Sequence, residues 1–120
     1  MDRRELGQRG ESAAVAYLQR VGFKVLERNW RTRAGEIDVI AADGEALVLV
    51  EVKTRRTLSK GSPEDAVSPA KQRKLGRLAA AYIQRMGREP AQVRFDVVTI
   101  HVLGEDRAVL RHHRAAFQLT

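Results

Sequence analysis

Two acidic side chains and one lysine lie in neighbouring segments that could together bind a metal ion and act on a phosphate. Asp38 alternates with aliphatic residues after Gly35, and Glu51 and Lys53 stand two residues apart in the next apolar segment. Carboxylates without His or Cys neighbours suit Mg²⁺ or Mn²⁺ rather than zinc. A divalent cation activates water, and a nearby lysine can orient that water or stabilise developing negative charge. These residues indicate metal-dependent phosphodiester hydrolysis, or alternatively a structural ion pair at a sheet edge.

Whether these side chains meet depends on how the two segments pair. If Asp43-Gly44 is a two-residue turn, the flanking segments form a hairpin in which Asp38 pairs with Leu49. Because side chains alternate between faces, Asp38 and Glu51 are then diagonal neighbours on one face, with Cα atoms roughly 7–8 Å apart. The opposite face is purely apolar and is expected to belong to the core: Ile37, Val39, Val48, Val50 and Val52.

Charge is distributed unevenly along the chain. The 120 residues carry 22 Lys and Arg against 15 Asp and Glu, a formal net charge of +7. Residues 35–52 contain five acidic side chains and no basic one. Excess positive charge favours polyanions such as nucleic acid, for which clustered carboxylates are unfavourable unless a cation sits among them. The charge pattern is therefore consistent with a nucleic-acid-binding protein that holds a metal ion.

Composition excludes several other classes. The chain has no cysteine, which removes disulfide scaffolds, thiolate zinc sites and cysteine nucleophiles. Its longest strongly apolar run, Ala46 to Val50, is far shorter than the roughly 20 residues that a membrane helix needs. Its first residues lead into no apolar segment, so no secretory signal is evident. We expect one cytoplasmic domain over residues 1–120, with no membrane association.

Hydrophobic periodicity predicts two helices and five strands in the order αβββαββ. Helical spacing of apolar residues covers 6–21 and 68–86, and strand patterns cover 23–31, 36–41, 46–54, 92–101 and 108–112. A loop over residues 57–69 precedes the second helix. Strands mixed with helices on this scale indicate an α/β fold, with one sheet that carries helices on its faces.

At these residues the sequence resembles the YraN-like bacterial proteins of the restriction-endonuclease-like, PD-(D/E)XK nuclease superfamily. The resemblance is carried by several ordered blocks: Gly10-Glu11, Ala13-Ala14, Tyr17-Leu18, Arg28-Asn29-Trp30-Arg31, Gly35-Glu36-Ile37-Asp38, Val50-Glu51-Val52-Lys53-Thr54-Arg55 and Lys71. It implies a restriction-endonuclease-like αβββαβ core with a mixed central sheet flanked by helices. Ile37 stands where the superfamily motif has proline.

The resemblance also implies roles for individual residues. Asp38 matches the motif aspartate, Glu51 the second metal-binding acid and Lys53 the motif lysine. Holliday-junction resolvases of this superfamily often supply another acid from the first helix, and Glu11 matches that position. Asp38, Glu51 and Glu11 are therefore the expected ligands of Mg²⁺ or Mn²⁺, and together with Lys53 the expected catalytic residues.

The expected function is a metal-dependent endonuclease acting on DNA, including branched repair and recombination intermediates, with a homodimer as one possible assembly. Basic and polar residues near the acids are the candidates for nucleic-acid binding: Lys71, Arg31, Arg33, Arg55, Arg56, Lys60 and Gln72. By contrast, Lys74 is assigned to the solvated surface of the second helix. The alternative function is a non-catalytic nucleic-acid-binding or adaptor protein on the same fold.

Overall fold

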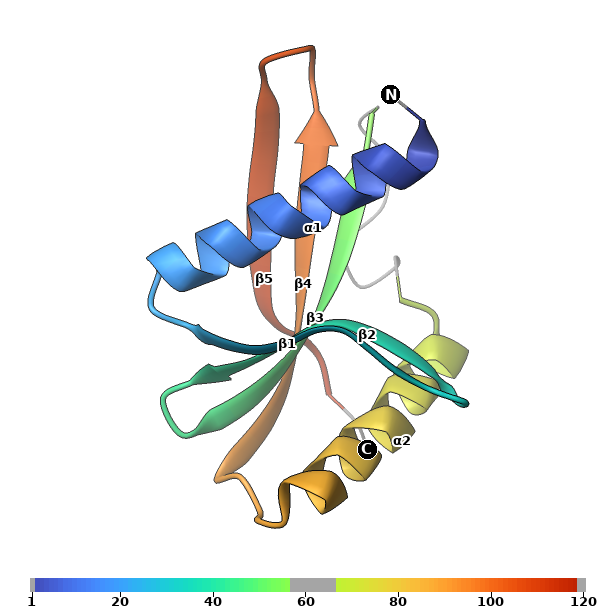
Figure 1. Ribbon diagram of the computed structural model, residues 1–120, viewed down its shortest axis with the longest axis vertical. Coiled ribbons are helices and arrows are strands. Elements are labelled where there is room, and N and C mark those ends of the chain that lie inside the picture. The colour runs from blue at the N-terminus through green and yellow to red at the C-terminus, as the bar shows by residue number, and fades with distance from the viewer. Residues whose placement is uncertain (1, 57–66, 119–120) are drawn as a thin grey trace.

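The computed structural model describes residues 2–56 and 67–118, and within them the chain forms two helices and five strands. In chain order the elements are α1 (Arg3–Arg20), β1 (Lys24–Thr32), β2 (Gly35–Asp43), β3 (Ala46–Arg55), α2 (Pro69–Met86), β4 (Gln92–Val102) and β5 (Ala108–Phe117) (Figure 1). This is the predicted αβββαββ order.

The five strands form one mixed sheet. Their order in the sheet is β1-β2-β3-β4-β5, and every neighbouring pair is antiparallel except β3 and β4, which are parallel. A parallel pair needs a crossover, and α2 lies in the segment that joins these two strands. A five-stranded mixed sheet flanked by two helices confirms the predicted α/β class and is compatible with a restriction-endonuclease-like core.

The sheet has a separate apolar cluster on each face. Ala14 and Leu18 of α1 pack with Val48 and Val50 on one face. On the other face, the buried side chains of α2 pack in a cluster that contains Leu47 and Leu49. Alternate residues of β3 thus enter different clusters, which explains why this strand is apolar on both sides. The prediction of one sheet that carries helices on its faces is confirmed.

Local sequence signals fix where the helices begin and end. The Asp2 carboxylate accepts a hydrogen bond of 2.8 Å from the Glu5 amide and caps α1, so this helix begins before the predicted residue 6. At α2 the Ser68 hydroxyl caps the Lys71 amide at 3.1 Å. Gly87 then ends α2 in the left-handed conformation, with a φ of 78°.

The register of the β2–β3 hairpin differs from the prediction by two residues. Asp43 pairs with Ala46, and the two-residue turn is Gly44–Glu45 rather than Asp43-Gly44. Gly44 has a φ of 59°, a value that glycine adopts without steric cost at the first position of the turn. Because side chains alternate with a period of two, a two-residue shift leaves the side chains of the paired residues, 39–43 and 46–50, on their predicted faces.

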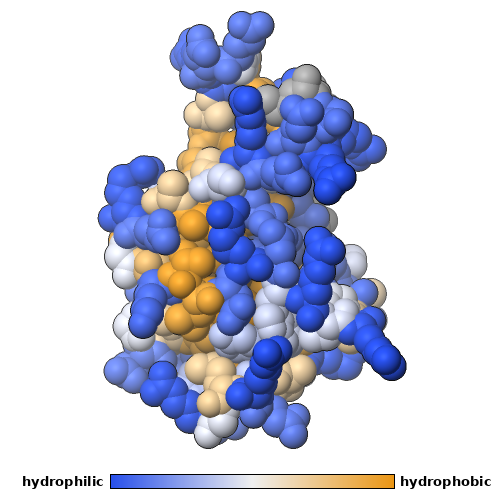
Figure 2. All heavy atoms as spheres, in the orientation of Figure 1, coloured by the Kyte–Doolittle hydropathy of each residue, from blue (hydrophilic) through white to orange (hydrophobic). Residues whose placement is uncertain are grey.

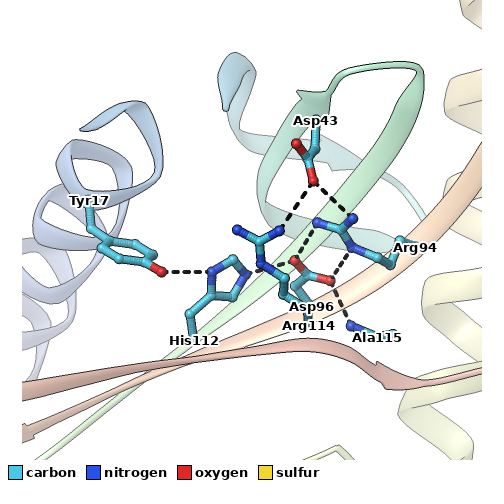
Figure 3. A network of polar contacts seen from close by, with 7 residues as sticks. All are labelled: Tyr17, Asp43, Arg94, Asp96, His112, Arg114 and Ala115. Atoms are coloured by element: carbon cyan, nitrogen blue, oxygen red, sulfur yellow. Dashed lines mark hydrogen bonds and ion pairs between the residues drawn. The ribbon is translucent and has the colours of Figure 1, made fainter. Parts of the chain in front are cut away.

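The strand β5 continues past its predicted end at His112, because a buried polar network holds it against β4. Asp96 of β4 accepts hydrogen bonds from Arg94 Nε at 2.9 Å, His112 Nε2 at 2.7 Å and the Ala115 amide at 3.0 Å (Figure 3). The register of the pair shifts between Phe95 and Val97, and Ala115 has a φ of 51°. The network therefore accommodates an irregular strand that hydrophobic alternation does not reveal.

The same network connects the sheet to α1. The Tyr17 hydroxyl lies 3.0 Å from His112 Nδ1 (Figure 3). Since the Asp96 carboxylate can only accept, a neutral His112 donates from Nε2 and accepts the Tyr17 hydroxyl proton at Nδ1. His112 is therefore a structural residue that joins Asp96 of β4 to Tyr17 of α1.

Helix α1 approaches β3 most closely at Gly10. A Cβ atom on Gly10 would lie 1.8 Å from Thr54 Oγ1 and 2.9 Å from Thr54 Cβ. A glycine is therefore required for α1 to cross the strand at this distance. The next residue, Glu11, lies close enough to Asp38 for its charge to act on that carboxylate.

We expect Gly10→Ala to destabilise the fold by about 1–3 kcal/mol, because the added methyl group must displace the helix or the strand. Urea unfolding followed by circular dichroism measures this loss. Gly7→Ala is the matched control, because a Cβ at Gly7 meets no atom within 4 Å. The double variant Gly10→Ala/Thr54→Ala should recover part of the lost stability. Equal stabilities of Gly10→Ala and the control Gly7→Ala would contradict the predicted contact.

No helix within the described residues is long and apolar enough to cross a membrane. The face seen in Figure 2 is covered mostly by hydrophilic side chains, with one apolar area beside the middle of the sheet.

Candidate functional site

The candidate site lies where β2 and β3 stop pairing. The backbone ladder between the two strands ends at Val39 opposite Val50, and the strands then diverge (Figure 1). One more step of the same register would place Asp38 opposite Glu51. Instead, Asp38 Oδ2 accepts a hydrogen bond of 2.8 Å from the Val52 amide. The carboxylate of Asp38 is therefore anchored to β3 immediately beside Glu51, rather than diagonally from it as predicted.

The divergence of the two strands also changes which face Ile37 occupies. Ile37 and Ile40 both belong to the α2-side cluster, although residues three apart in a regular strand point to opposite faces. Val39 lies in the α1-side cluster as predicted. The prediction that Ile37 shares a face with Val39 is wrong, because the regular alternation of β2 is lost where the strand leaves β3.

Glu51 is a buried carboxylate with two lysine partners. It is 6% exposed, and its Oε1 atom lies 3.4 Å from Lys53 Nζ and 3.1 Å from Lys71 Nζ. Burying an unpaired carboxylate is costly, so these two cations permit its position in the sheet. Lys53 comes from the same strand, whereas Lys71 reaches the acid from the first turn of α2. The structure thus brings three of the predicted site residues together.

Asp38 carries the largest perturbation of a carboxyl group at this site. Burial raises its pKa from 3.8 to about 7, and the neighbouring negative charge of Glu51 acts in the same direction. The charge of Glu11 also raises the pKa of Asp38, while the Val52 amide and the Lys71 ammonium lower it. Two closely spaced acids that resist being ionised together are a common feature of cation-binding and catalytic sites.

Glu11 lies on α1 at the edge of this group. Its Oε1 atom accepts a hydrogen bond of 2.5 Å from Asn29 Nδ2, and Asn29 has a left-handed φ of 51°. The charge of Glu11 acts on Asp38, as the raised pKa of that carboxyl indicates. Glu11 therefore borders the Asp38–Glu51 pair while its own carboxylate is held by β1.

Among residues 2–56 and 67–118, no three His, Cys, Asp or Glu side chains converge closely enough to form a complete metal centre. Mg²⁺ is commonly held by one or two carboxylates, with water and substrate phosphate completing its shell. Asp38 and Glu51 meet this requirement, since both supply hard oxygen donors. A bound cation would also offset the mutual repulsion that raises the pKa of Asp38. The residues present therefore fit a divalent cation whose coordination shell is completed by water and the substrate phosphate.

The predicted nucleic-acid-binding residues differ in their surroundings. Arg33 lies at the exposed tip of the β1–β2 hairpin, and Arg55 and Arg56 are exposed at the end of β3. Gln72 donates from Nε2 to the Val67 carbonyl at 3.0 Å, which fixes the chain before α2. Lys60 lies outside the described residues.

A depression of about 380 Å³ opens between the β1–β2 hairpin and α2. It is lined by Arg31, Thr32, Gly35, Glu36, Lys71, Lys74, Leu75 and Leu78. Lys71 both lines this depression and contacts Glu51, so the depression adjoins the acids. Lys74 is exposed, as predicted for the solvated surface of α2, and its side chain also lines this depression, because the β1–β2 hairpin lies over this part of the helix.

Comparison with known proteins finds close relatives over nearly the whole chain. A protein of Geobacter sulfurreducens is 46% identical over 95% of this chain and 89% of its own length. Proteins of Rhodococcus jostii and Symbiobacterium thermophilum are 47% and 48% identical, and the matches cover 95% and 97% of those chains. All three are named UPF0102 proteins. Residues 10–100 match the model of the Uncharacterised protein family UPF0102, and the chain therefore belongs to this family.

Proposed function

We propose that this protein is a metal-dependent endonuclease that hydrolyses phosphodiester bonds in DNA, as a member of the PD-(D/E)XK superfamily. The observation that carries the proposal is the position of Asp38 beside Glu51 at the divergence of β2 and β3, with Lys53 adjacent. The net charge of +7 supports a polyanionic substrate.

Each residue of the site has a distinct part in the proposed reaction. Asp38 and Glu51 would hold Mg²⁺ or Mn²⁺, with Glu11 as a further acid at the edge of the site. The cation supplies an activated water and offsets charge on the phosphate. Lys53, two residues from Glu51 on the same strand, orients the water or donates to a phosphate oxygen. In the hydrolysis the oxygen of one water bonds to phosphorus, the P–O bond to the departing strand end breaks, and the proton released by that water is taken up by the departing oxygen.

The proposed substrate class includes branched DNA, because the sequence resembles Holliday-junction resolvases. A four-way junction has two equivalent strands to cut, and a homodimer would match that symmetry.

A second candidate function is nucleic-acid binding without catalysis. It is favoured by the two lysines that already neutralise Glu51 without a metal ion. In that case the acids and lysines would form a structural ion-pair group at the end of the β2–β3 ladder.

A cleavage assay with variants separates the two functions. Labelled duplex, single-stranded, flap and four-way-junction DNA are incubated with protein and Mg²⁺, Mn²⁺ or EDTA. Cleavage that requires metal, and that Glu51→Gln and Lys53→Ala each abolish, supports the nuclease. Glu45→Gln is the matched control, since Glu45 is exposed in the β2–β3 turn. The non-catalytic function would instead be supported if the protein bound DNA but did not cleave it in either metal, and if Glu51→Gln bound DNA more tightly.

A further inference from the structure

The depression beside the acid pair has the composition of an anion site. Its walls contribute three cations, Arg31, Lys71 and Lys74, against one carboxylate, Glu36. Leu75 and Leu78, two buried side chains, provide its apolar part. Basic groups that adjoin apolar surface interact more strongly with a phosphate than the same groups in open water, because the local dielectric constant is lower.

Lys74 is held in this depression by the backbone of the β1–β2 hairpin. A Cβ atom on Gly35 would lie 2.6 Å from Lys74 Cε and 3.2 Å from its Nζ. The lysine stem thus crosses directly over Gly35, whose φ of 147° suits glycine. Within the described part of the chain, no carboxylate forms an ion pair with Lys74. Its charge is therefore available to a ligand.

The other two cations of the depression are already engaged with acids. Lys71 Nζ lies 3.1 Å from Glu51, which connects the depression to the proposed catalytic site. Arg31 Nε lies 3.1 Å from Glu36 at the exposed rim. An anion in the depression would compete with Glu36 for Arg31, and removing the Glu36 charge should therefore favour the anion.

We infer that this depression binds a backbone phosphate of the nucleic-acid strand, next to the phosphate that reaches Asp38 and Glu51. The inference rests on the proposed function and extends it, because it assigns Lys74 and Arg31 to the strand flanking the cleaved bond. Lys71 lies between the two positions and contacts the acid site from the depression. The depression thereby determines which strand segment crosses the acid pair.

The test measures DNA binding without cleavage, by fluorescence anisotropy of a labelled 5′-hydroxyl single-stranded oligonucleotide in EDTA at several salt concentrations. We expect Lys74→Gln to weaken binding about three- to tenfold at low salt and to reduce the slope of log K against log salt by about one. We expect Glu36→Gln to tighten binding, an outcome that a misfolded variant does not give. Lys74→Arg should retain binding.

Arg85→Gln is the matched control. Arg85 is exposed near the end of the same helix, 11 residues and about 16 Å from Lys74, and does not line the depression. If Lys74→Gln and Arg85→Gln change the salt slope equally, the phosphate site is overturned. If Lys74→Gln weakens binding only of a 5′-phosphorylated oligonucleotide, the depression binds a terminal phosphate and the assignment to an internal phosphate is overturned.

The inference and the proposed function can fail separately. Metal-dependent cleavage with an unchanged salt slope in Lys74→Gln would overturn only the phosphate site. A reduced slope in Lys74→Gln, in a protein that cleaves no DNA in either metal, supports the phosphate site and removes the nuclease.

Discussion

Asp38→Asn is expected to abolish DNA cleavage and, at the same time, to stabilise the metal-free protein. The proposed nuclease should lose about a thousandfold or more in rate, because an amide is a poor ligand for Mg²⁺ and leaves Glu51 alone. The fold should gain about 1–3 kcal/mol at pH 8, because burial and the charge of Glu51 penalise the ionised form of Asp38. The asparagine carbonyl can still accept the Val52 amide hydrogen bond.

The sign of the pH dependence distinguishes this stabilisation from a general one. The pKa of Asp38 is about 7 in the folded protein, against 3.8 for the unperturbed carboxyl group. Between these values the folded state binds more protons than the unfolded state, so the contribution of Asp38 to stability falls as the pH rises. Above about pH 7 the contribution no longer changes. The advantage of Asp38→Asn should therefore be near zero at pH 4 and largest above pH 7.

Thermal unfolding in EDTA from pH 4 to 8.5 measures this difference. The control, Glu45→Gln, should follow the unmodified protein at every pH, because Glu45 is exposed. Adding Mg²⁺ at pH 8 should raise the Tm of the unmodified protein more than that of Asp38→Asn, since only an intact acid pair binds the cation well. A difference in stability that stays constant with pH would show that Asp38 is not perturbed in this way.

The second large effect is expected on the opposite side of the sheet, at Asp96. We expect Asp96→Ala to destabilise the fold by about 3–5 kcal/mol, because Arg94 and His112 would lose the charged acceptor that both of them contact. Asp96 is 1% exposed, so water cannot easily replace its hydrogen bonds. Urea unfolding at pH 7 measures the loss, with the exposed Asp106→Ala as control.

The pH dependence at Asp96 has the opposite sign to that at Asp38. Burial alone would raise the pKa of Asp96, but the hydrogen bonds from His112, Arg94 and the Ala115 amide lower it below its usual value. The stabilisation that Asp96 contributes is therefore complete above the unperturbed pKa of 3.8 and is lost as the pH falls through the lower pKa of the folded protein. Asp96→Ala should lack this acid-dependent loss. A cost below 1 kcal/mol at pH 7 would show that the network does not support the fold.

Tyr17→Phe tests the outer contact of the same network. It should cost only about 1 kcal/mol, because one partly buried hydrogen bond to His112 is lost and no charge is left unpaired. An equal cost for Tyr17→Phe and Asp96→Ala would contradict the central role of the carboxylate.

The order of the elements and the proximity of Asp38 to Glu51 on neighbouring strands were predictable from the sequence. Hydrophobic periodicity and the residues at helix ends are local, and they identify helices and strands without any knowledge of packing. The turn was predicted incorrectly, but the shift of two residues left the paired part of β2 on its predicted faces. Asp38 lies beyond that paired part and reaches β3 through its hydrogen bond with the Val52 amide. Within the paired stretch, the face on which a side chain lies was therefore predicted correctly although its cross-strand partner was not.

Only the tertiary structure decided the surroundings of these residues. On the N-terminal side of Val39, where β2 no longer pairs with β3, Ile37 packs in the α2-side cluster. The β1–β2 hairpin lies over α2, which brings Lys74 against Gly35. Asp96 lies between Phe95 and Val97 in β4, and two of its partners, His112 and Ala115, are 16 and 19 residues away in the sequence. Contacts between residues far apart in the sequence are determined by the fold. Residue type and spacing along the chain give information only about nearby positions.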